Sequence, residues 1–168
     1  MSHARDSSED AFVGVLFGED ELGVVVRAHI HVEAKLLELL ALLVPDPTYL
    51  ERMDLDFGQR VNLAVALGLK AEHAPALSAL GNLRNAVAHS LGAGLSEDRI
   101  NSLYATLSAG DKDVVQRAYE RTKAQLKRAG APPFKKLSPK ERFILISVAL
   151  RGMLMVAIGE IRARRTGV

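Results

Sequence analysis

The spacing of the apolar residues constrains the fold most, because it follows a helical period wherever it is strong. Residues 21–44 (ELGVVVRAHIHVEAKLLELLALLV) repeat apolar positions every three or four residues, and Pro45 and Pro47 end this run. No stretch shows the clear alternation of apolar and polar residues that is typical of a half-buried strand. The pattern therefore predicts an all-α protein.

Local signals divide the chain into about six helices, which we expect to form one bundle. Ser138 and Glu141 form a capping box around Pro139, which suits the first helical position. Gly and Pro residues at 130–133 break the preceding helix. The predicted helices cover 21–44, 57–67, 75–91, 97–107, 111–128 and the segment from 139 onward.

A chain of 168 residues is long enough for one domain with a continuous core. We expect a flexible, polar N-terminus over 1–17 and a helical domain over 18–165. Residues 143–158 are very apolar, but Arg151 interrupts them, so we expect a buried or dimer-facing helix and no membrane span. The chain has no cysteine, which excludes disulfides and thiolate metal sites and fits a cytoplasmic protein.

The helix predicted over 76–91 carries an arginine where an apolar residue is expected. Arg84 falls between Leu80 and Val87 in the apolar stripe, whereas Asn85 and His89 are i,i+4 neighbours in a separate polar strip that also holds Asn82. An arginine keeps its proton when it is buried, so it needs a carboxylate, a set of carbonyls or a cleft.

Two interpretations of this strip stay open. In the structural one, Arg84 pairs with a carboxylate of the 21–44 helix, where His29 and Glu33 form a polar pair, and Glu33 is the first candidate. His89 would then stabilise the end of its own helix through the helix dipole. In the functional one, Arg84, Asn85 and His89 belong to an active site.

The segment LRNAVAH resembles the R-N-x-x-x-H signature of the HEPN superfamily of helical bundles, whose members commonly dimerise through this region. In the nuclease members, the arginine and histidine of two subunits meet and cut RNA without a metal. The resemblance implies that His89 is a general acid/base, that Arg84 stabilises the charged transition state and that Asn85 orients one of them. Toxin members often carry a tyrosine two residues after the histidine, where this chain has Leu91.

Four segments in order are also similar to the mannitol operon repressor family: DELGVVVRAHIHVEAKLLELL, DFGQRVNLAVALGL, LGNLRNAVAHS and ERFILISVALRGMLM. That family contains helical HEPN-like proteins described as transcriptional regulators without a recognisable helix-turn-helix. The resemblance covers nearly the whole chain and implies a regulator that binds protein or nucleic acid.

The charge is distributed unevenly along the chain. Residues 1–111 carry a net charge of −8 and residues 112–168 carry +10, although the total is +2. The basic part is a solvated face, a contact for the acidic part of another subunit, or a contact for phosphates. Few aromatic residues interleave with it, so base stacking is not indicated. The candidate phosphate contacts are Arg117, Arg121, Lys123, Lys127, Arg128, Lys135 and Lys136.

No other chemistry is indicated by the sequence. His29 and His31 point to different sides of a helix, and the chain contains no HExxH, P-loop, GxGxxG or GxSxG motif. We therefore expect no metal and no cofactor. The leading hypothesis is a homodimeric cytoplasmic regulator, and the alternative is a metal-independent ribonuclease that uses Arg84, Asn85 and His89. A third hypothesis is an interaction module in which the motif only builds the dimer.

Overall fold

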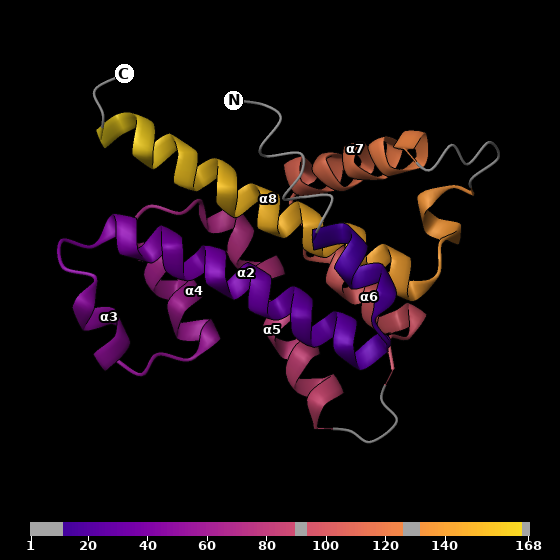
Figure 1. Ribbon diagram of the computed structural model, residues 1–168, viewed down its shortest axis with the longest axis horizontal. Coiled ribbons are helices and arrows are strands. Elements are labelled where there is room, and N and C mark those ends of the chain that lie inside the picture. The colour runs from indigo at the N-terminus through magenta and orange to yellow at the C-terminus, as the bar shows by residue number, and fades with distance from the viewer. Residues whose placement is uncertain (1–11, 90–93, 126–131, 166–168) are drawn as a thin grey trace.

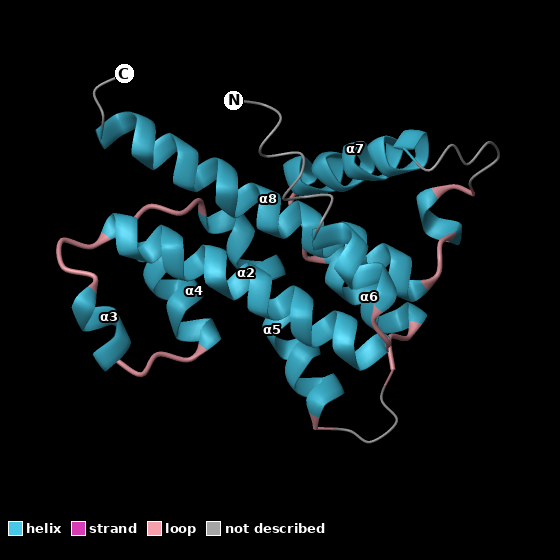
Figure 2. Ribbon diagram, in the orientation of Figure 1, coloured by secondary structure: helices cyan, strands magenta, loops and turns pink. Residues whose placement is uncertain are grey.

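The computed structural model describes residues 12–89, 94–125 and 132–165 (Figure 1). The described residues form helices and no strand (Figure 2), which confirms the all-α prediction. After a short helix at 12–18, the elements in chain order are α2 (Glu21–Leu43), α3 (Thr48–Arg52), α4 (Phe57–Ala66), η1 (Ala71–His73), α5 (Ala74–Ala88), α6 (Glu97–Ala105), α7 (Ala109–Gln125), η2 (Phe134–Lys136) and α8 (Pro139–Arg165).

Side-chain caps explain where the main helices begin. Asp20 accepts a hydrogen bond from the backbone N–H of Gly23 at the start of α2. Asp56 and Gln59 form a reciprocal capping box at the start of α4. Ser96 caps α6, and the predicted capping box at Ser138 opens α8. These polar signals therefore set the helix boundaries that position the rest of the molecule.

Helix α8 forms the centre of the bundle and packs mainly against α2 and α7, with α6 beside its first half (Figure 1). Every residue from 142 to 151 is buried, because neighbours cover this half of the helix on all sides. The helix is long and apolar enough to cross a membrane, with a mean hydropathy of 2.0 over its most apolar window, but 61% of that window is buried within the protein. This part of α8 is thus the core element of the fold.

The expectation of a flexible N-terminus over 1–17 is wrong for residues 12–17, which belong to a helix. Residues 12–18 are helical, and the side chains of Phe12 and Leu16 are almost fully buried. The Phe12 ring lies 4.7 Å from the His31 ring and 5.0 Å from the Arg151 guanidinium carbon. This short helix is therefore part of the packed domain, as its apolar residues allow.

Candidate functional site

The last two turns of α5 carry the motif residues on different sides of the helix. Asn85 and His89 are exposed, and the backbone N–H of His89 donates to the carbonyl of Asn85 at the end of the helix. Arg84 is half-buried. Within the described part of the chain, no hydrogen bond or ion pair links the three side chains to one another.

Glu33 is the predicted partner of Arg84, and that prediction is wrong. The guanidinium of Arg60 on α4 donates to the Glu33 carboxylate instead. Arg84 itself is half-buried, and its side chain forms no ion pair in the part of the chain that the structure describes. Arg84 stays close enough to His29 to act on its ionisation. An arginine that reaches solvent needs no fixed counter-ion, which explains how this cation is tolerated among apolar neighbours.

His29 is the buried member of the cluster behind Arg84. Its side chain is 2% exposed, its Nδ1 lies 3.7 Å from a carboxylate oxygen of Glu33, and its ring packs 4.4 Å from that of Phe57. Burial lowers the pKa of His29, Glu33 opposes this shift, and the positive charge of Arg84 reinforces it. The ring is therefore neutral at neutral pH.

An apolar stripe on the outer face of α2 borders this cluster. Ile30 is 56% exposed and Leu37 is 38% exposed. They stand three residues before and four residues after Glu33, so all three share one side of the helix. Ala34, which is exposed, and Val26 and Ala41, which are half-buried, continue the stripe at the same helical spacing. We call Val26, Ile30, Ala34, Leu37 and Ala41 the α2 stripe.

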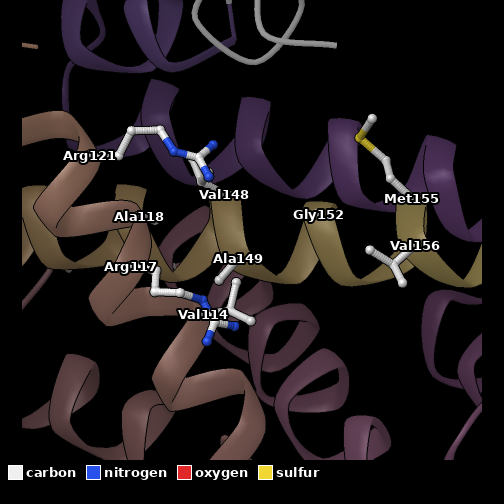
Figure 3. Close-up of a pocket in the computed structure, with 9 residues that line it drawn as sticks. All are labelled: Val114, Arg117, Ala118, Arg121, Val148, Ala149, Gly152, Met155 and Val156. Atoms are coloured by element: carbon white, nitrogen blue, oxygen red, sulfur yellow. The ribbon is translucent and has the colours of Figure 1, made fainter. Parts of the chain in front are cut away.

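The remaining predicted residues do not converge on the motif. Asn82 is exposed and lines a hollow of about 390 Å³ between α5 and α6. Arg117 and Arg121 are exposed and line a hollow of about 220 Å³ between α7 and α8 (Figure 3). The side chain of Lys123 is 37% exposed, and Lys135 and Lys136 are exposed. Lys127 and Arg128 lie outside the described residues.

Sequence reasoning missed one polar cluster, which forms where η1 meets the start of α7. Asp111 is buried, and one of its carboxylate oxygens lies 3.0 Å from Nδ1 of His73 and 2.8 Å from Oγ of Ser108. The spacing of Ser108 and Asp111 is that of a helix cap and could have been recognised in the sequence. The contact with His73 could not, because 38 residues separate the two side chains.

Across 12–89, 94–125 and 132–165, no group of three or more His, Asp or Glu side chains is placed to hold a metal ion. The motif itself offers the imidazole of His89, the guanidinium of Arg84 and the amide of Asn85. No family model, curated protein or solved structure matches this chain.

Proposed function

We propose that the protein is a cytoplasmic regulatory protein of the mannitol operon repressor type, which acts as a homodimer by binding protein or nucleic acid. The observation that carries this proposal is the α2 stripe, in which Ile30 and Leu37 are exposed on the side of α2 that holds Glu33. Exposed apolar residues arranged along one helix face are typical of a surface that another chain covers. Isolated exposed apolar residues would need no such explanation.

The position of the motif supports the same proposal. Asn85 and His89 reach solvent, and neither they nor Arg84 line the hollows between α5 and α6 or between α7 and α8. A motif that is open on one chain can be closed by a second chain. The resemblance to HEPN proteins, which commonly dimerise through this region, agrees with this arrangement.

The oligomeric state can be tested by light scattering of the purified protein. We expect a dimer, and we expect Ile30→Glu combined with Leu37→Glu to give a folded monomer, because two charges would enter the apolar interface. Tyr49→Glu is the control, because Tyr49 is 57% exposed on α3 and lies outside the α2 stripe. A wild-type monomer at micromolar concentration would contradict the proposal.

The second candidate function is a metal-independent ribonuclease. Two exposed polar side chains, Asn85 and His89, sit one helical turn apart and remain accessible to a substrate. His89 would take the proton from the attacking 2′-hydroxyl or donate a proton to the leaving 5′-oxygen as its bond to phosphorus breaks, and Arg84 would stabilise the negative charge on the phosphoryl oxygens.

This candidate can be tested by incubating the protein with mixed RNA in EDTA. Cleavage that persists in EDTA and disappears in His89→Ala would establish the nuclease. His31→Ala is a suitable control, because it removes a histidine of α2 that lies outside the motif. Intact RNA with the wild-type protein would contradict the nuclease and leave the regulator and the interaction module.

A further inference from the structure

A groove runs between α7 and the second half of α8, on residues that the motif does not use. It consists of two adjoining hollows of about 220 and 480 Å³, which share Val114 and Val156 in their linings. The α8 residues along it extend from Val148 to Arg164. This span corresponds to about 24 Å of α-helix, which is the length of four turns or more.

The floor of the groove is apolar and open. Val156 is the most exposed large apolar residue of the described chain, at 62%. Gly152 leaves a gap in the helix surface, since a Cβ atom built there would meet nothing within 4 Å. Met155 lies beside it (Figure 3). The floor therefore offers recesses that apolar side chains can fill.

The wall on the α7 side is basic. Arg117 and Arg121 are one turn apart on α7, and Figure 3 shows the Arg121 guanidinium beside Val148 of α8 and the Arg117 guanidinium beside Val114 of α7. Two bases, Arg164 and Lys70, and two acids, Glu72 and Glu160, line the other hollow. The Asp111 carboxylate also lines it and lies within hydrogen-bond distance of His73 and Ser108. Two exposed arginines of α7 thus border the apolar floor next to Val148.

We propose that this groove binds an amphipathic helix with acidic flanks, supplied by a partner protein. This inference rests on the proposed regulatory function, because it specifies the kind of protein that the regulator would bind. An apolar helix face would fill the recesses of the floor, and its carboxylates would pair with the arginines of the wall. Neither hollow is lined by Phe, Tyr or Trp, so a nucleic acid would find phosphate contacts but no stacking surface.

The test uses fluorescence anisotropy with a labelled helical peptide of about 18 residues, which carries leucines at i, i+4, i+7 and i+11 and glutamates on both flanks. Its match is the same peptide with lysine in place of every glutamate. We expect saturable binding of the acidic peptide and at least about tenfold weaker binding of the lysine peptide. Val156→Glu should weaken the acidic peptide by a similar factor, because a charge would stand in the apolar floor.

Charge reversal of the wall identifies the contacts. Arg117→Glu with Arg121→Glu should reverse the preference, so that the lysine peptide binds better than the acidic one. Each reversal changes the charge by two units, so Arg117→Glu alone is matched by Lys135→Glu on exposed η2, which should alter affinity less than about twofold. The fold of each variant can be checked by circular dichroism, and the three changed residues are all exposed.

Several outcomes would overturn the proposal. One is the absence of saturable binding up to about 1 mM peptide. Another is a loss of peptide affinity in Lys135→Glu as large as in the arginine variants. A third is that the arginine variants weaken RNA binding but leave peptide binding unchanged. If Val156→Glu dissociates the dimer, the groove is a subunit interface. The variant Ile30→Glu with Leu37→Glu separates this proposal from the proposed function, since loss of the dimer there should leave peptide affinity intact.

Discussion

Two arginines that lie beside apolar residues of a helix, Arg142 and Arg84, have different surroundings. Arg142, at the start of α8, is 3% exposed, donates to Glu97 at 3.1 Å and to Asn101 at 2.7 Å, and lies over the Phe134 ring. Arg84, at the end of α5, is half-buried and forms no ion pair within the described residues. One guanidinium joins helices together, and the other stays accessible.

The difference shows that an arginine in an apolar stripe does not by itself indicate a site. Arg142 is surrounded by partners from α6, so its charge stabilises the packing of α6 on α8. The positive charge of Arg84 acts on His29 of α2 and lowers the pKa of this histidine further. Partners, not spacing, separate the structural arginine from the candidate functional one.

The largest effect is expected from Arg142→Ala. The substitution removes two charge-assisted hydrogen bonds and leaves a cavity, so the free energy of unfolding should fall by about 2–3 kcal/mol. Urea denaturation measures this loss. Arg162→Ala is the control, because its pair with Glu38 is exposed and should contribute less than about 1 kcal/mol. Equal losses in the two variants would contradict the structural role of Arg142.

The second-largest effect is expected from acidification, which should destabilise the protein through the buried side chain of His29. The pKa of His29 is lowered in the folded protein from its usual 6.5, mainly by burial, so the unfolded chain binds the proton more readily. Stability is therefore full above pH 6.5 and is lost as the pH falls through the folded pKa. His31 shifts in the same direction, also mainly through burial.

This pH effect is measured by urea denaturation between pH 7.5 and 5. His29→Leu should flatten the profile, and His31→Gln separates the contribution of the second histidine. A wild-type profile that rises on acidification would show that His29 gains a proton in the folded state.

A smaller effect is expected at the Glu33–Arg60 pair. Both side chains are about one-quarter exposed, so solvent weakens their attraction. Glu33→Gln and Arg60→Ala should each cost about 0.5–1 kcal/mol and show coupling in a double-mutant cycle. Coupling of Glu33 to Arg84 in place of Arg60 would reverse the assignment of partners.

The smallest effect on stability is expected from Arg84→Ala. The side chain loses only the packing of its aliphatic part, so the free energy of unfolding should change by less than about 1 kcal/mol. The same variant should disrupt RNA cleavage or dimer formation if the motif has either role. A loss as large as that of Arg142→Ala would make Arg84 a structural residue.

The helices could be predicted because their signals are local. The caps at Asp20, Asp56, Ser96 and Ser138 lie within four residues of the turns that they start, and all four begin helices in the structure. The helix at 12–18 and α3 were missed, since each is too short to show a clear period. The existence and type of the long helices were therefore accessible from sequence.

The partners of the site residues could not be predicted in the same way. Helical spacing places Arg84 in the apolar stripe of its helix and Glu33 one turn after His29, but it does not say which helix each side chain faces. Arg60 lies 27 residues from Glu33, and packing of α4 against α2 brings them together. The groove between α7 and α8 depends in the same way on how two distant helices meet.

The central place of α8 also has a consequence for how the chain folds. The closest association in the bundle joins α2 to α8, and Lys140 donates to the carbonyl of Phe17 at 3.1 Å across 123 residues of chain. Contacts between such distant segments are slow to form, because a long loop must close before they are gained. During synthesis α2, α4 and α5 emerge first and cannot bury their apolar faces on α8 until it follows. A ribosome-bound chain that stops before Pro139 should therefore recruit chaperones, whereas one that includes α8 should not.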